Sequence, residues 1–448
     1  MTENPSTPNR DSDLPYQPAV GSDYPDRHSL ANEIHSRPYM RLEPPLNISH
    51  IATLSGEGGA GTDHAHVARL CQVLGAPEPE PEATHHWCEV DSIRFRWERH
   101  TEFSTYTFIT PGDGSEPFSN PAIYRIPEEW RAYLPGKLLV ALHIEVENRD
   151  QPVRDTWTIA DFFGGNTITG STLSEGRAQA WTDHQIYADG FQRILLRDID
   201  LDPRRAGRLI QRLLEMETYR LIAMLAFPLA KTALTRIGRV EQKLNLLIFE
   251  LSKTSAPTGE RELLAHLTEL AIETENIVAE TSYRFGAAKA YHKIVERRLK
   301  DIRETRLDEL QMMGSFMTRR LAPAMETCET VATRLESLSR RVARAGDLLR
   351  TRVDISLEEQ NHDLLISMDR RAQLQVRLQQ TVEGLSVVAI SYYLVGLIAY
   401  TAKGASKFGM PWSPDIVTLV ALPIVLLAVW SGVRRIRRAI TEKHKDGA

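Results

Sequence analysis

The stretch GLSVVAISYYLVGLIAYTA (residues 384–402), followed after a short polar loop by IVTLVALPIVLLAVWSGV (residues 416–433), decides the architecture of this chain. The first run has 19 residues and the second has 18, and neither contains a charged side chain. A helix of this length crosses a hydrocarbon core of about 30 Å. Two such runs in tandem favour a membrane hairpin over a buried soluble helix, so the rest of the chain is expected to be attached to a bilayer.

The charges that flank the two runs predict how the hairpin is oriented. Basic residues follow the second run directly, whereas the connecting loop (residues 403–415) holds only Lys403 and Lys407 as basic residues. By the positive-inside rule the C-terminus is cytoplasmic, and two crossings then leave the N-terminus in the cytoplasm as well. Tyr400, Trp412 and Trp430 stand near the ends of the runs, as interfacial aromatic residues do. The basic cytoplasmic anchor, within residues 434–448, consists of Arg434, Arg435, Arg437 and Arg438.

The N-terminal end of the chain indicates in which compartment the residues before the hairpin lie. It opens with MTENPSTP, which has neither a basic segment nor an apolar segment of a secretory signal. The residues before the hairpin are therefore expected to stay in the cytosol. The predicted location is the bacterial inner membrane, with two spans.

Composition excludes several classes of function. A net charge of −5 with mixed signs gives no continuous basic stripe, so we expect no nucleic-acid partner, and the basic tail fits lipid headgroups. The three cysteines, Cys71, Cys88 and Cys328, are far apart and lack a Cys-x-x-Cys pair. This pattern predicts buried reduced thiols, without a disulfide framework or a zinc knuckle, and no metal ligands are assigned.

The residues before the hairpin divide into three parts by composition. Residues 1–25 are rich in Pro, Asn, Ser and Asp and are expected to be a disordered tail. Residues 26–200 alternate strand-like and helix-like segments, which predicts an α/β layered domain with one core. The expected strands are 46–54, 92–97, 106–109, 138–146 and 194–199, and the expected helices are 65–74, 127–133 and 157–163.

Residues 201–383 are predicted to be helical, with breaks near 254–259 and 306–314. Asp202-Pro203 is a typical helix start, and Leu335, Leu338 and Val342 begin a coiled-coil stripe. Because no strong helix breaker occurs over 324–384, one stalk helix is expected to run directly into the first crossing. Such a helix needs partners, which we expect to be both the preceding helices and further copies of the chain. The predicted fold class is thus an α/β domain, a long helical coiled stalk and a two-helix transmembrane hairpin.

Two resemblances can be identified from specific segments. HSLANEIHSRPY (residues 28–39), continuing through Pro44-Pro45 to SHIA (residues 49–52), resembles the opening of an uncharacterised family of bacterial membrane-anchored proteins, over nearly the whole chain. LRTRVDISLEEQN (349–361), LSVVAI (385–390) and GMP (409–411) are similar to the CorA superfamily of divalent-cation channels. The second resemblance implies a pentamer whose first crossing lines a pore, with a divalent cation as ligand or transported ion and no other cofactor.

The external loop departs from the CorA pattern. The Gly-Met-Asn signature that follows the first crossing in that family is missing, and Lys403 and Gly404 stand at this position. A ring of lysines would repel cations at a pore mouth. Gly409, Met410 and Pro411 lie further along and do not replace the signature, and an ordinary loop turn is the simpler interpretation of them.

Within the first crossing, one face carries small or hydroxyl-bearing residues at 3-4-3-4 spacing. This face avoids lipid and fits either a close helix-packing seam, which is slightly favoured, or the lining of a pore. The residues of this face are Ser386, Ala389, Tyr393, Gly396 and Tyr400.

A histidine-rich segment near the N-terminus offers the only candidates for catalysis. His28, Asn32, Glu33, His35, Arg37 and His50 are close in sequence, but their spacing fits no metal site and no carboxylate pair accompanies them. A structural role is favoured. His64, His66, His85 and His86 lie in a polar or acidic loop context without a third ligand nearby and are interpreted as surface histidines. No catalytic residue is assigned.

Three hypotheses for function follow. The first is a CorA-like oligomeric conduit or regulated transporter for cations, anchored in the lipid bilayer. The second is a membrane-tethered scaffold or sensor that does not conduct. The third, and weakest, is a membrane-tethered enzyme that uses the segment around His35 and Arg37, so we expect that the protein is not an enzyme.

Overall fold

A computed structural model of the chain describes residues 24–25, 27, 39–56, 59–81, 83–112, 116–253, 257–406 and 413–443. The chain divides into two compact units, which are treated separately below. The first comprises Met1–Ile248 and Leu267–Arg344, and the second comprises Phe249–His266 and Ala345–Ala448.

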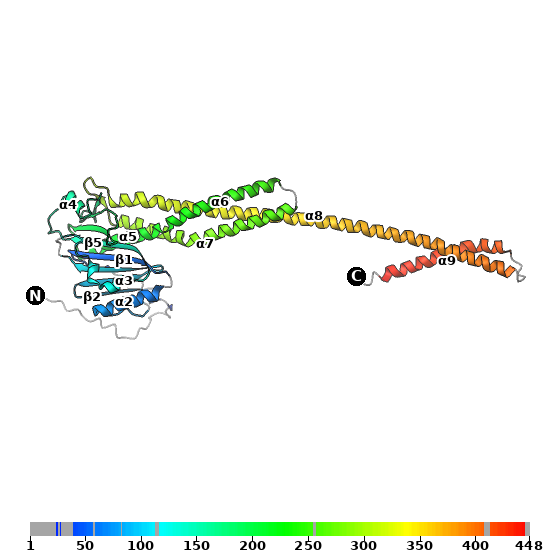
Figure 1. Cartoon of the computed structure of the whole chain (residues 1–448), viewed down its shortest axis with the longest axis horizontal. Coiled ribbons are helices and arrows are strands. Elements are labelled where there is room, and N and C mark those ends of the chain that lie inside the picture. Colours follow the sequence, from blue (N-terminus) through cyan, green and yellow to red (C-terminus); the bar gives the residue numbers. More distant parts are fainter. Residues whose placement is uncertain are drawn as a thin grey trace. The chain divides into compact units, whose positions relative to one another are not determined.

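A mixed nine-stranded sheet forms the centre of the first unit, with strand order β2-β3-β4-β1-β5-β8-β7-β6-β9 (Figure 1). β5 and β8 are parallel, and the other neighbours are antiparallel. The strands are β1 (Leu46–Leu54), β2 (His85–Val90), β3 (Ile93–Arg99), β4 (Phe103–Pro111), β5 (Lys137–Glu147), β6 (Thr169–Leu173), β7 (Ala178–Thr182), β8 (Gln192–Asp198) and β9 (Thr305–Arg306).

Helices cover both faces of this sheet. On one face, α2 (Ala60–Leu74), the 3-10 helix η2 (Ala122–Arg125) and α3 (Glu128–Ala132) close an aromatic core around Phe95, Phe108 and Trp130. On the other face, α5 (Pro203–Met224) packs against β5, with Ile222 buried beside Phe103. Because side chains of a strand alternate between the two faces, the neighbouring residues Ile51 and Ala52 of β1 belong to different cores.

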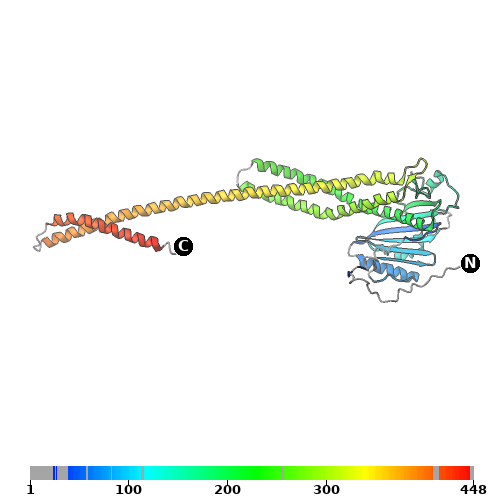
Figure 2. The ribbon, with the colours of Figure 1, turned by 180° about the vertical axis from the view of Figure 1, so that it is seen from behind.

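The remaining helices are long, apart from α4 (Thr156–Asp161) near the β6–β7 end of the sheet. Asp202 caps α5 by accepting hydrogen bonds from the backbone N–H groups of Arg204 and Arg205 at 3.0 and 2.9 Å, and Pro203 is the first helical residue, as predicted. In the first unit, α6, α7 and the first part of α8 run side by side (Figure 2), joined by ion pairs such as Arg334–Glu241 and Lys289–Glu329. The long helices are α6 (Ala226–Lys253), α7 (Pro257–Asp301), α8 (Met313–Ser406) and α9 (Pro414–Lys443).

The start of α8 is attached to the edge of the sheet. β9, in the connection between α7 and α8, pairs with β6. The backbone N–H of Met313 donates to the Ser171 hydroxyl of β6 at 2.9 Å, and the N–H of Gly314 donates to the Glu304 carboxylate at 3.0 Å. Ser171 in turn donates to Glu304. These bonds satisfy backbone donors that lack a partner within the helix.

The expected α/β domain and mostly helical C-terminal part are confirmed. The five predicted strands correspond to β1, β3, β4, β5 and β8, and the bounds of β1 agree at both ends. The prediction that residues 201–383 are helical apart from two breaks missed β9, a two-residue strand at Thr305–Arg306 beside the second break. β2, β6 and β7 were not predicted, since their short polar sequences lack the apolar runs of the central strands. The predicted unbroken helix over 324–384 lies within α8, and nearly all of the predicted tail lies outside the described residues.

Candidate functional site

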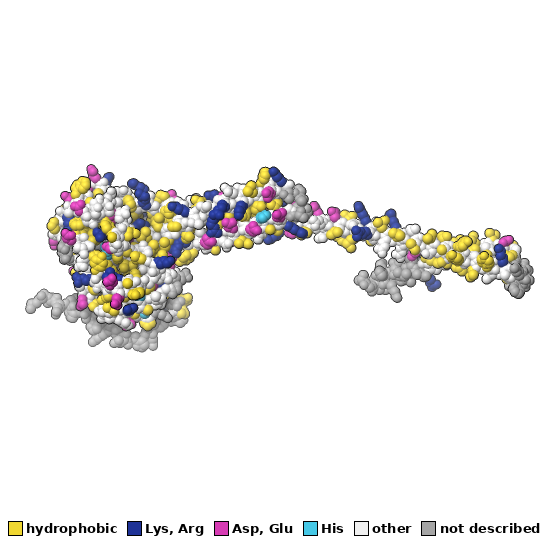
Figure 3. All heavy atoms as spheres, viewed as in Figure 1, with side chains coloured by type: hydrophobic (Ala, Val, Ile, Leu, Met, Phe, Trp, Pro, Cys, Tyr) yellow, Lys and Arg dark blue, Asp and Glu magenta, His cyan; other side chains and the backbone are white. Residues whose placement is uncertain are grey.

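Among the described residues, three helical stretches are long and apolar enough to cross a membrane, by length and composition. Two are the C-terminal part of α8 and most of α9, where only 6% of the most apolar window is buried. Hydrophobic side chains (yellow) cover these segments in Figure 3. The two predicted runs are therefore both helical and both present apolar side chains outward.

The third stretch, Pro203–Lys253, was not singled out from the sequence. It comprises α5 and α6, and 33% of its most apolar window is buried within the fold. Leu209 and Leu213 of α5 and Ile237 of α6 are fully buried in the first unit. Part of this stretch is thus buried within the protein, whereas other apolar side chains of α6, such as Leu229 and Leu246, are exposed.

The predicted small-residue face of α8 is mostly exposed. Ser386, Ala389, Tyr393 and Tyr400 are exposed, and Gly396 is half-buried. Among the described residues of the two apolar segments, only Ser391 of α8 and Val425 of α9 are buried. At about 100° per residue, Ser391 lies roughly 200° around the helix from Tyr393. The small-residue face and the buried side of α8 therefore point in opposite directions.

The predicted loop and anchor residues lie at the ends of these helices. Lys403 and Gly404 belong to the last turn of α8, whereas Gly409, Met410 and Pro411 lie outside the described residues. Arg434 and Arg435 are exposed near the end of α9. Arg437 and Arg438 also belong to α9, but their side chains are outside the description.

Of the histidine-rich segment, only His50 is described, because His28, Asn32, Glu33, His35 and Arg37 lie outside the described residues. His50 is buried in β1, where Nδ1 is 2.8 Å from the Thr107 hydroxyl and Nε2 is 3.0 Å from the Thr218 hydroxyl. Burial, with a contribution from His100 and Arg96, lowers the pKa of His50 to about 3. A neutral imidazole that joins the sheet to α5 fits the structural role predicted for this residue.

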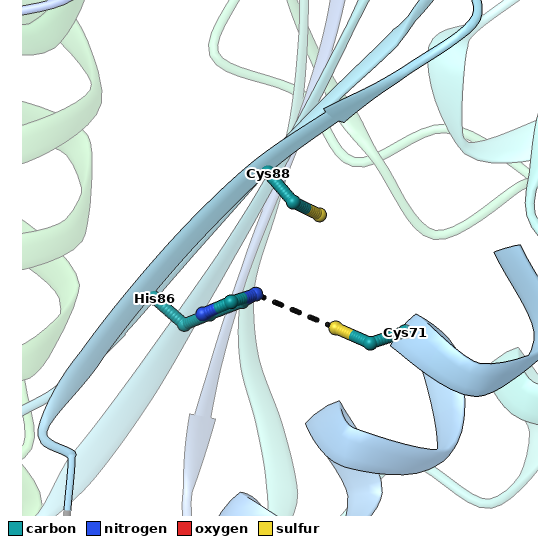
Figure 4. Close-up of side chains that lie close together, drawn as sticks. All are labelled: Cys71, His86 and Cys88. Carbon is teal, nitrogen blue, oxygen red and sulfur yellow. Dashed lines mark hydrogen bonds between the residues drawn. The ribbon is translucent and has the colours of Figure 1, made fainter. Parts of the chain in front are cut away.

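The structure brings together three further side chains that the sequence left unconnected: Cys71, His86 and Cys88 (Figure 4). Cys71 Sγ lies 3.5 Å from His86 Nε2, and the ligand atoms of all three residues lie within 4.8 Å of one another. Cys71 comes from α2, while His86 and Cys88 come from β2. Both thiols are buried and His86 is half-buried.

The electrostatics of this cluster follow from its burial. A hydrogen bond with Cys88, together with burial, raises the pKa of the Cys71 thiol, and the same hydrogen bond lowers the pKa of Cys88. Burial lowers the pKa of His86, so the ring is neutral near pH 7 and its nitrogen can act as a ligand. Two thiols and a neutral imidazole form a donor set that transition metals bind.

Comparison with known protein families matches residues 22–440 to DUF3422, described as a protein of unknown function. The chain belongs to the DUF3422 family. This agrees with the resemblance of the histidine-rich segment to an uncharacterised family. No curated protein and no solved structure matches this DUF3422 protein. The resemblance to the CorA superfamily is not shown by these comparisons.

One signal in the sequence of this DUF3422 protein could have revealed the cysteine cluster. His86 and Cys88 are separated by one residue, so they lie on the same face wherever that segment is a strand. The segment was instead assigned to surface histidines, because β2 was not predicted. The partner Cys71, 15 residues away from His86, could be identified only once α2 was packed on that face.

Proposed function

We propose that this DUF3422 protein is a membrane-anchored, homo-oligomeric conduit for cations, in which the sheet domain acts on the first crossing through α8. The continuity of α8 supports this proposal. The helix begins on the sheet edge, at Ser171 and Glu304, and extends without interruption to the apolar run before Ser406. A displacement of the sheet edge can therefore reach the membrane segment through one continuous helix.

The apolar segments of α8 and α9 insert in the bilayer as a hairpin, with both chain termini in the cytoplasm. Their apolar side chains are largely exposed among the described residues, and a hydrocarbon phase would remove them from water. The basic residues after the second segment, including the exposed Arg434 and Arg435, favour the cytoplasmic side. The Pro203–Lys253 stretch remains outside the bilayer, because 33% of its most apolar window is already buried in the protein, as are Leu209, Leu213 and Ile237.

Self-association is supported by a leucine repeat on α8. Leu357, Leu364, Leu378 and Leu385 follow a seven-residue spacing, and all are exposed in the single chain. A seven-residue repeat is what packs identical helices together in a coiled coil. Arg371 occupies the remaining position of the repeat, which fits an assembly whose interior is partly hydrated. Further copies of the same chain are the partners that fit such a repeat. We propose that five copies assemble.

The leucine repeat and the small-residue face lie on the same side of α8. Ala389 and Tyr393 follow Leu385 by four and eight residues, which continues the stripe into the first crossing. α9 packs on the opposite side, where Ser391 is buried. In an oligomer held by the repeat, Ser386, Ala389, Tyr393, Gly396 and Tyr400 would face the central axis and α9 would face lipid.

A non-conducting membrane-tethered scaffold or sensor is the second candidate. Lys403 in the last turn of α8 and the missing Gly-Met-Asn signature favour it, because a ring of ammonium groups repels cations. In that case the same face of α8 is a helix-packing seam.

Flux through proteoliposomes that contain the full chain separates the two candidates. Uptake of Mg²⁺ and of monovalent cations is compared for the wild type, Gly396→Leu, Tyr393→Ala and Val388→Ala. Val388 is exposed but lies about 120° away from the face, so it is the matched control. A conduit predicts flux that Gly396→Leu reduces at least tenfold and Val388→Ala leaves unchanged. Absence of flux from a confirmed oligomer would eliminate the conduit and leave the scaffold.

A further inference from the structure

Three potential metal ligands converge between α2 and the edge strand β2, in the sheet domain. We propose that Cys71, His86 and Cys88 bind a thiophilic transition-metal ion, with Zn²⁺ as the preferred ion and one coordination position left for a further ligand. This site is independent of the proposed conduit, since it is formed entirely by the first unit and needs no membrane.

The distances already approach those of a tetrahedral site. With Zn–S near 2.3 Å and Zn–N near 2.05 Å, two ligand atoms at a tetrahedral angle are about 3.6 Å apart for the S–N pair. Cys71 Sγ and His86 Nε2 are 3.5 Å apart, and no ligand pair exceeds 4.8 Å. Only a small adjustment of side-chain rotamers is needed to reach bonding distance.

The backbone fixes where these ligands lie. His86 and Cys88 occupy alternate positions of β2, so they share one face, while Trp87 between them is exposed on the other. Cys71 is in the last turn of α2, next to the fully buried Leu70 in the aromatic core. The three ligands therefore come from packed elements rather than from loops. Folding has already ordered these side chains, so metal binding has little further conformational entropy to overcome.

The surroundings of His86 fit a metal ligand as well. The Pro77 backbone hydrogen-bonds the imidazole, as a carbonyl typically does for a histidine whose other nitrogen holds a metal. His86 is half-buried, which gives an ion a route from solvent that the buried thiols do not offer. The Glu78 carboxylate acts electrostatically on Cys71 but is not among the ligand atoms that lie within 4.8 Å of one another, so water would take the fourth position.

The donor set selects the ion. Two thiolates and one imidazole suit Zn²⁺ or Cu⁺, whereas Mg²⁺ and Ca²⁺ require oxygen ligands. The site would therefore not bind a hard divalent ion of the kind that the conduit is proposed to carry. Binding would fasten β2 to α2, because a bound ion links the helix to a strand that, among the described strands, pairs only with β3. Thiol deprotonation makes the affinity rise with pH.

The test uses the full-length, tag-free protein in detergent, reduced and stripped of metal with a chelator. Co²⁺ is titrated first, because thiolate coordination gives charge-transfer absorption in the near ultraviolet and tetrahedral geometry gives intense visible bands. Zn²⁺ is then titrated against the cobalt complex. The expected result is one ion per chain, displaced by Zn²⁺, and an apparent melting temperature raised by about 5–10 °C when free Zn²⁺ exceeds its Kd a hundredfold.

The variants are Cys71→Ser, Cys88→Ser and His86→Gln, and Cys328→Ser is the matched control because Cys328 is a buried cysteine of α8 outside the cluster. Each variant of the cluster is expected to lose at least 100-fold in affinity, while Cys328→Ser keeps the wild-type spectrum. His86→Gln replaces a half-buried side chain and keeps the fold testable if a serine variant does not fold. Binding that survives His86→Gln and either serine variant, or no thiolate-to-cobalt band in reduced wild-type protein, would overturn the proposal.

Discussion

The backbone N–H of Met313, the first residue of α8, donates a hydrogen bond to the hydroxyl of Ser171 on β6 at 2.9 Å. The same hydroxyl donates to Glu304, whose carboxylate accepts the N–H of Gly314. One serine and one glutamate thus join the sheet edge to the start of the helix that ends in the apolar run. If the sheet domain acts on the membrane segment, this junction is where the movement is transmitted.

Ser171→Ala is expected to loosen the junction. The Met313 N–H and the Glu304 carboxylate would each lose a partner in a buried setting, which costs about 1–3 kcal/mol. Hydrogen exchange of the first-turn amides of α8 should accelerate. Thr172→Ala is the control, because Thr172 points to the opposite face of β6. Equal exchange in the two variants would show that Ser171 does not hold the helix.

Asp63→Asn is expected to destabilise the sheet domain strongly. Asp63 is fully buried in the first turn of α2, where it pairs with Arg99 and accepts hydrogen bonds from Ser55 and Ser104 at 2.7 and 2.6 Å. Removing its charge leaves the buried Arg99 unpaired, at a cost of about 3–5 kcal/mol.

The exposed pair Arg94–Glu89 provides a matched comparison for that variant. Glu89→Gln should cost less than about 1 kcal/mol, because both side chains of the Arg94–Glu89 pair are exposed to solvent. Thermal unfolding followed by circular dichroism compares the two. A similar loss in both variants would contradict the assigned role of Asp63.

Acidification is expected to destabilise the sheet domain through His50. Its folded pKa of about 3 lies below the unfolded value of 6.5, so the unfolded chain binds the proton more readily. The stabilising contribution is complete above pH 6.5 and is lost as the pH falls from 6.5 towards 3. At pH 5 the loss amounts to about 2 kcal/mol, at 1.36 kcal/mol for each pH unit.

The same pH dependence distinguishes titration from hydrogen bonding. His50→Gln removes the titrating group and should flatten the stability profile between pH 6.5 and 4. Thr218→Val removes one hydrogen-bond partner of His50 but leaves the imidazole, so the slope should remain. A slope unchanged in His50→Gln would assign the acid sensitivity to other groups, such as His143, whose pKa burial lowers to about 4.

The orientation of the hairpin is tested by thiol accessibility in intact cells. A membrane-impermeant reagent should label Ser406→Cys from outside and should not label Ala448→Cys, which lies outside the described residues. The three native cysteines are buried and contribute little background. External labelling at position 448 would contradict a cytoplasmic C-terminus.

Periodicity and caps predicted much of the fold. β1 lies at the centre of the sheet and contains the β-formers Ile48, Ile51 and Thr53, so local sequence and burial agree. Asp202-Pro203 carries its cap within four residues. β2 and β9 were missed for a different reason. β2 is a polar edge strand, and β9 is two residues long and exists because β6 is there to pair with it. Such elements are determined by tertiary contacts.

The two candidate sites also differ in how far the local sequence determines them. The face from Ser386 to Tyr400 lies on one helix, so spacing alone defined it, but the side on which α9 packs required the structure. The cluster of Cys71, His86 and Cys88 required both the strand register of β2 and the packing of α2 on that face. Sequence spacing identifies a site when one element carries it and fails when several elements converge.

If identical α8 helices surround a common axis, as proposed, the number of subunits in mild detergent should reveal it, and native mass spectrometry determines that number. We expect a pentamer, as the resemblance to the CorA superfamily implies, and Leu364→Asn combined with Leu378→Asn should dissociate it because both changes fall on the leucine repeat. Leu365→Asn, at an equally exposed position about 100° around the helix, should leave it intact. Five copies in the wild type, lost only in the repeat variant, are the predicted result, and a monomer or dimer would contradict the account.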